Sequence, residues 1–101
     1  MLSLIVRPDA ETDITDGALW YETQSPGLGS DFLRSVDACL ADIARAPQRF
    51  PVVHRNMRRA LIRRFPYGVF FVDSEETVEV VACLHARRDP RQWSERLRRD
   101  R

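Results

Sequence analysis

Residues 57–71 have the sequence MRRALIRRFPYGVFF, and this stretch decides how the second half of the chain folds. Two arginine pairs bracket a short apolar segment, and Phe65, Pro66 and Tyr67 then lead into a second apolar segment. Short apolar segments bounded by turn residues are typical of β-strands. Because arginine is costly to bury without a partner, we expect these guanidinium groups at a surface.

Working outward from this stretch, we expect three strands at residues 57–64, 67–73 and 77–84, joined as an antiparallel meander. Successive strand residues point to opposite faces of a sheet. The apolar residues of the third strand that we assign to the helix-covered face are Val78, Val80, Ala82 and Leu84. The opposite face would carry a second apolar strip that needs a cover, made of Val69, Phe71, Val81 and Cys83.

The first half of the chain predicts one short strand and two helices. Residues 2–6 are apolar and stop at Pro8, which is favourable in the first turn of a helix. Apolar residues at helical spacing predict helices at residues 9–24 and 28–45, with a turn at residues 25–27 between them. Residues 46–56, which include His54, are expected to form a loop, and a short last helix is expected from Pro90 through Trp93 and Leu97.

The order β-α-α-β-β-β-α predicts one α+β domain over residues 1–101. In this fold a helical hairpin packs on a mainly antiparallel four-stranded sheet. The first strand is expected to join the meander, at an edge that the sequence leaves open.

Charge is divided unevenly along the chain. Residues 1–50 contain four arginines and eight acidic residues, whereas residues 51–101 contain twelve arginines and seven acidic residues. This asymmetry favours an acidic or polyanionic partner for the second half. Cys39 and Cys83 are too few for a zinc site, so we expect no metal and no cofactor. The apolar start is too short to span a membrane, and we expect a cytoplasmic protein with reduced thiols.

Several motifs in this order resemble the RelE/ParE superfamily of type II toxin–antitoxin toxins, over nearly the whole chain. They are Pro8 after the first strand, Trp20-Tyr21, residues 26–29 (PGLG), Ala46-Pro47, residues 58–71 (RRALIRRFPYGVFF) and residues 80–93 (VVACLHARRDPRQW). The resemblance implies a bacterial growth inhibitor that stabilises plasmids and is neutralised by a cognate acidic antitoxin. It also implies one of two targets: messenger RNA in the ribosomal A site, which is cleaved without a metal, or DNA gyrase, which is inhibited without catalysis.

The resemblance also gives candidate site residues. Ribonuclease chemistry needs cations around the phosphate and a group that transfers protons. We expect Arg59 and Arg63 to share one strand face, with Arg87 and His85 completing a catalytic cluster. The candidate binding residues are Arg58, Arg64, Tyr67, Arg88, Arg91 and Trp93.

Two departures weaken the ribonuclease interpretation. Gly68 stands where RelE-like ribonucleases carry a basic residue, and Trp93 stands near their C-terminal tyrosine although an indole cannot act as acid or base. Whether the chain is an enzyme therefore stays open. The alternative is a non-enzymatic binding module, a degenerate toxin that acts only by forming a complex with its antitoxin.

Overall fold

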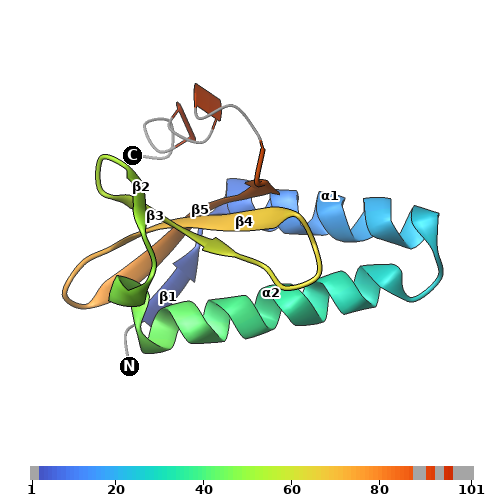
Figure 1. Cartoon of the computed structure of the whole chain (residues 1–101), viewed down its shortest axis with the longest axis horizontal. Coiled ribbons are helices and arrows are strands. Elements are labelled where there is room, and N and C mark those ends of the chain that lie inside the picture. Colours follow the sequence, from blue (N-terminus) through green and yellow to red (C-terminus); the bar gives the residue numbers. More distant parts are fainter. Residues whose placement is uncertain (1–2, 88–90, 93–94, 97–101) are drawn as a thin grey trace.

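The computed structural model describes residues 3–87, 91–92 and 95–96. Within them, both long helices cover one face of a single five-stranded sheet with the order β1-β5-β4-β3-β2 (Figure 1). The elements are β1 (Ser3–Val6), α1 (Pro8–Gln24), α2 (Leu28–Arg45), a short 3₁₀ helix η1 (Pro47–Arg49), β2 (Val52–His54), β3 (Met57–Leu61), β4 (Tyr67–Asp73) and β5 (Thr77–His85).

The sheet confirms the predicted meander and adds a strand to it. β3, β4 and β5 pair antiparallel in sequence order, and β1 joins the free edge of β5 in parallel. The prediction of a loop around His54 was wrong, because β2 pairs with β3 and makes a fifth strand at the other edge. With three residues, β2 is too short to show a strand periodicity in the sequence.

A β-bulge corrects the predicted faces of the sheet. The β4–β5 register shifts between Phe70 and Phe71, so that Phe70 pairs with Ala82 while Phe71 pairs with Val80 and Val81 is the extra residue. Beyond such a bulge the alternation of faces is reversed. Val78 and Val80 face the helices and Val81 lies on the opposite face, as predicted. The other assignments are reversed: Ala82 and Leu84 lie on the opposite face, and Val69, Phe71 and Cys83 lie in the helix-side core.

β3 is also shorter than the sequence suggested. It ends at Leu61 instead of continuing to Arg64, which adopts a left-handed backbone conformation with φ of 73°. That conformation is incompatible with an extended strand. The Ile62 N–H donates to the Tyr67 carbonyl at 3.0 Å and closes the connection to β4.

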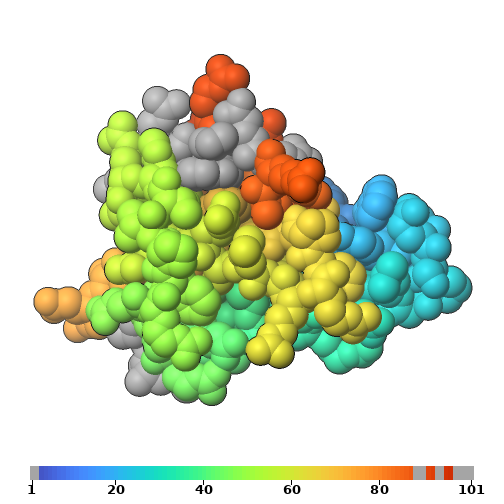
Figure 2. All heavy atoms as spheres, in the orientation of Figure 1, coloured from blue at the N-terminus to red at the C-terminus, as the bar shows by residue number. Residues whose placement is uncertain are grey.

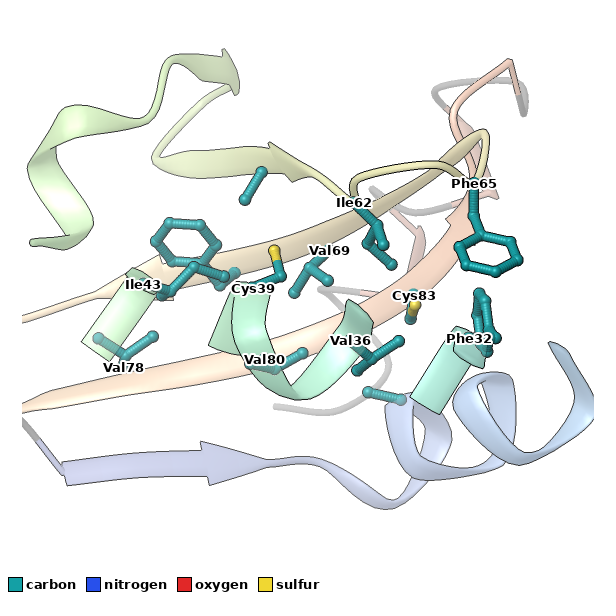
Figure 3. Close-up of a cluster of buried hydrophobic side chains, with 13 residues drawn as sticks. Phe32, Val36, Cys39, Ile43, Ile62, Phe65, Val69, Val78, Val80 and Cys83 are labelled. Atoms are coloured by element: carbon teal, nitrogen blue, oxygen red, sulfur yellow. The ribbon is translucent and has the colours of Figure 1, made fainter. Parts of the chain in front are cut away.

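The main core lies between the helices and the sheet (Figure 3). The inner face of α2 supplies Phe32, Val36, Cys39 and Ile43, which pack on strand residues such as Val69. Burial raises the pKa of the Cys39 thiol to about 11, and Asp42 adds to this shift. Burial likewise raises the pKa of Cys83 to about 12, with further contributions from Asp13 and Cys39. Both cysteines are therefore protonated at neutral pH and serve as core residues.

The turn between the helices is fixed by one carboxylate. Glu22 in the last turns of α1 accepts hydrogen bonds from the Gly27 N–H at 3.1 Å and the Gly29 N–H at 3.0 Å. It thereby pairs backbone donors at the start of α2 that have no partner within the helix. Gly27 has a φ of 89°, which glycine adopts without strain. This cap holds the hairpin closed in the position that covers the sheet.

A second, smaller core lies on the face of the sheet opposite the helices, which we call the outer face. Its buried residues are Met57, Phe70, Val81, Ala82 and Leu84. Residues 91–92 and 95–96 are helical and return over this face (Figure 1). Pro90, Trp93 and Leu97 of the predicted last helix lie outside the described residues. No helix in the described parts of the chain is long and apolar enough to cross a membrane.

Candidate functional site

Most partly buried arginines of the described chain have structural roles. Arg7 Nη2 lies 2.8 Å from a carboxylate oxygen of Glu79. Arg58, a predicted binding residue, bonds the Asp73 carboxylate at 3.0 Å through Nε and the Phe50 carbonyl at 2.7 Å through Nη1. Arg58 therefore ties β3 to the end of β4 and to the segment after η1, and its charge is already balanced inside the protein.

Arg96 forms the third of these pairs. Its Nη1 lies 2.7 Å from Asp13 Oδ2, and the side chains of Arg96 and Asp13 are only 15% and 11% exposed. The same Asp13 oxygen accepts the backbone N–H of Cys83 at 3.0 Å, at a point on β5 that β1 no longer covers. One carboxylate on α1 thus joins the uncovered edge of β5 to a residue more than 80 positions along the chain.

Arg59 has no such partner. It follows Met57 on the outer face, and its Nε is buried without a hydrogen-bond acceptor. Its aliphatic stem lies against Gly68 on β4: a Cβ added to Gly68 would lie 3.1 Å from Cγ and 3.2 Å from Cδ of Arg59. The Arg59 side chain is held in place by packing and is not neutralised by any carboxylate of the described residues.

Arg63 and Arg64 lie elsewhere, in a groove between α2 and the end of β3. This groove has a volume of about 380 Å³ and is lined by Asp31, Arg34, Ser35, Ala38, Cys39, Asp42, Phe50, Leu61, Arg63 and Arg64. In Figure 2 the segment after β3, in yellow, borders α2, in teal and green. Because β3 ends before Arg63, the prediction that Arg59 and Arg63 share one strand face was wrong.

His85 and Tyr67 belong to a third location, beside α1. Their rings lie 5.9 Å apart at opposed positions of β5 and β4. A cavity of about 190 Å³ next to them is lined by α1 residues that include Asp16 and Trp20. His85 Nδ1 accepts the Arg87 backbone N–H at 3.2 Å, which places the proton of neutral His85 on Nε2. Tyr67 packs against Phe32 at 5.1 Å between ring centroids and is part of the core.

The predicted catalytic residues are therefore not brought together. Arg59 lies on the outer face, Arg63 in the groove beside α2, and His85 on the helix side next to α1. Arg87 and Arg91 are exposed, whereas Arg88 and Trp93 lie outside the described residues.

Sequence reasoning missed two residues that organise these surfaces. Asp13 belongs to none of the motifs singled out in the sequence, although it binds Cys83 and Arg96. Gly68 was considered only as a missing cation, although it provides the space in which the Arg59 stem lies. Both contacts join segments that are far apart in the sequence. They therefore cannot be predicted from the spacing of neighbouring residues.

The exposed side of the helical hairpin forms one further concave surface. Leu19 of α1 and Leu33 of α2 are 62% and 42% exposed. They flank a shallow cavity of about 290 Å³ whose lining includes Ala18 and Gly29. Exposed leucines on both sides of a cleft lined by small residues form an apolar groove, which is typical of a surface that receives a partner helix.

These observations define the class of protein: a small α+β domain with a helical hairpin over one sheet face, surface grooves beside the helices, and no assembled catalytic cluster among the described residues. A solved structure titled "Chromosomal ParDE TA system from P. aeruginosa" has this fold, with a TM-score of 0.75 and 13% identity over 84% of this chain and 96% of that one. A family model described as "ParE toxin of type II toxin-antitoxin system, parDE" matches residues 4–90. The chain belongs to this ParE toxin family, within the RelE/ParE superfamily. No curated protein was found to match it.

Proposed function

We propose that this protein is the toxin of a bacterial toxin–antitoxin pair that acts in the cytoplasm by binding DNA gyrase, without cleaving RNA. One observation carries the choice of target: Arg59, Arg63 and His85 lie in three separate places. Membership of the ParE toxin family supports the toxin role.

Metal-free RNA cleavage depends on proximity. A base must reach the ribose 2′-hydroxyl while cations hold the phosphate, and both must contact one nucleotide at the same time. Arg59 and His85 belong to opposite faces of the sheet, so one phosphodiester cannot contact both. This arrangement supports inhibition through surface binding, which requires no proton transfer.

We further propose that a cognate acidic antitoxin neutralises the toxin and that the pair stabilises a plasmid or another replicon. The apolar groove between Leu19 and Leu33 suits the apolar side of an amphipathic antitoxin helix. The arginines that remain exposed, such as Arg63 and Arg87, suit acidic residues in the rest of that partner.

Two assays run in parallel test the target. Purified toxin is added to gyrase with relaxed plasmid, and separately to ribosomes that hold a messenger RNA. We expect loss of supercoiling and intact messenger RNA. Cleavage of the messenger RNA together with unimpaired supercoiling would show that the target is the ribosome-bound message.

A further inference from the structure

Arg59 is exceptional among the arginines of the described residues. Those that are partly buried are Arg7, Arg58, Arg59 and Arg96. The other three each contact a carboxylate at 3.0 Å or less. Among the described residues, Arg59 contacts no carboxylate, and its buried Nε has no hydrogen-bond acceptor. A buried donor without a partner destabilises the fold, and more so when it carries charge. The protein therefore keeps an unsatisfied cation at a defined place.

The place is shaped by Gly68. The Arg59 stem lies where any residue other than glycine at position 68 would have its Cβ. A Cβ at that position would be 3.1 Å from Arg59 Cγ. Gly68 is opposed by Leu61 on β3 and by Leu84 on β5. Leu61 is 60% exposed, and Phe70 lies 3.5 Å from the same Cβ position. The Nε of the Arg59 guanidinium is buried, so this side of the guanidinium is desolvated, which strengthens its interaction with an anion.

We propose that Arg59, positioned by Gly68, is an anion-binding site on the outer face whose ligand is an aspartate or glutamate carboxylate in an extended acidic segment of the antitoxin. The inference rests on the proposed function, because it names one contact of the proposed partner. In the complex, the antitoxin carboxylate would neutralise Arg59. Arg7, Arg58 and Arg96 are neutralised by carboxylates of the toxin itself.

The neighbours of Arg59 favour a protein carboxylate over a nucleic-acid backbone. A phosphate polymer is held by several cations spaced along it. On β3, however, Arg58 is neutralised by Asp73, and Arg63 lines the groove beside α2. Arg59 and the exposed Leu61 are two positions apart on β3, so they match an extended peptide segment with an acidic and an apolar residue two positions apart, which share one face.

Calorimetric titration of the toxin with its antitoxin, at low and at high salt, tests this assignment. We expect Arg59→Gln to weaken the affinity by about thirtyfold or more, because it leaves a desolvated carboxylate of the partner unpaired. The matched control is Arg45→Gln, which removes the same charge from an exposed arginine that pairs with Asp42 on its own helix. We expect it to change the affinity by less than about threefold.

Gly68→Ala adds a test of the positioning role. Its new methyl group displaces the Arg59 stem, so the affinity should fall while the net charge is unchanged. Thermal unfolding of each variant separates a loss of fold from a loss of contact, and Arg59→Gln decides alone if Gly68→Ala does not fold.

Each outcome has one meaning. If Arg59→Gln binds the antitoxin as tightly as Arg45→Gln, the site is wrong although the antitoxin role stands. If Arg59→Gln instead lowers the affinity for duplex DNA and leaves that for the antitoxin intact, the ligand is a phosphate and the proposal is overturned. If the unmodified toxin does not bind the antitoxin, the proposed function itself fails.

Discussion

Phe32→Ala should lower the free energy of unfolding by about 4 kcal/mol, as expected for removing a fully buried aromatic ring. Phe32 is completely buried, and its ring lies 5.3 Å from those of Tyr21 and Phe65 and 5.1 Å from that of Tyr67, between ring centroids. Gly17 of α1 packs directly on this ring, since a Cβ there would lie 2.9 Å from it. The ring therefore joins both helices to the start of β4.

Urea unfolding followed by circular dichroism measures this loss. Because a domain of this size is stable by only about 5–15 kcal/mol, the variant should unfold at a much lower urea concentration. Leu33→Ala is the control, since the neighbouring side chain is on the exposed side of α2 and should cost less than about 1 kcal/mol. Equal effects of the two substitutions would contradict the orientation of α2.

Asp13→Ala should cost about 3 kcal/mol, the low end of the range for breaking a buried ion pair. The substitution leaves the Arg96 guanidinium without its 2.7 Å carboxylate partner and the Cys83 N–H without its acceptor. Both groups are largely shielded from water, so water replaces the lost contacts poorly. The effect should appear in the same urea experiment.

Asp16→Ala is the matched control for this second prediction. It removes the same charge from an exposed position of the same helix, and its cost should be below about 0.5 kcal/mol. A double-mutant cycle with Arg96→Ala isolates the pair and should give a coupling energy of about 1–3 kcal/mol. If Asp13→Ala and Asp16→Ala have the same stability, the link from α1 to β5 and Arg96 does not hold in solution.

Local periodicity explains why much of the fold could be predicted from the sequence. The apolar stripe of α2 predicts a helix, and Pro8 and Pro47 mark where the helical segments begin and end. The structure confirms the predicted ends of both helices within one residue. The three strands of the meander also appear, because each is bounded by turn residues. These features depend on residues that are close together in the chain.

The errors arise where one residue changes the register or where a contact is distant. Alternation alone cannot reveal the bulge at Val81, and therefore Cys83 and Leu84 were placed on the wrong faces. The strand ends at Leu61 because the chain turns at Arg64, which has a left-handed backbone conformation. An arginine in the sequence does not predict that conformation. That single difference separates Arg63 from Arg59 and removes the predicted cluster.

Charge segregation along the chain also has a partly internal explanation. Asp13 in the acidic half pairs with Arg96 in the basic half. Part of the asymmetry is thus used to hold the two halves together. Arg59 remains as the partly buried cation that no described carboxylate neutralises, which is why we propose it as a binding site for a partner on the outer face.

Growth of bacteria that express this chain without its antitoxin tests the central claim most directly. The claim is that the protein is a toxin that acts by binding and is neutralised by a partner. We expect induction to arrest growth with signs of DNA damage and with intact messenger RNA, and co-expression of the neighbouring antitoxin gene to restore growth. Normal growth of cells that accumulate the folded protein alone would contradict the account.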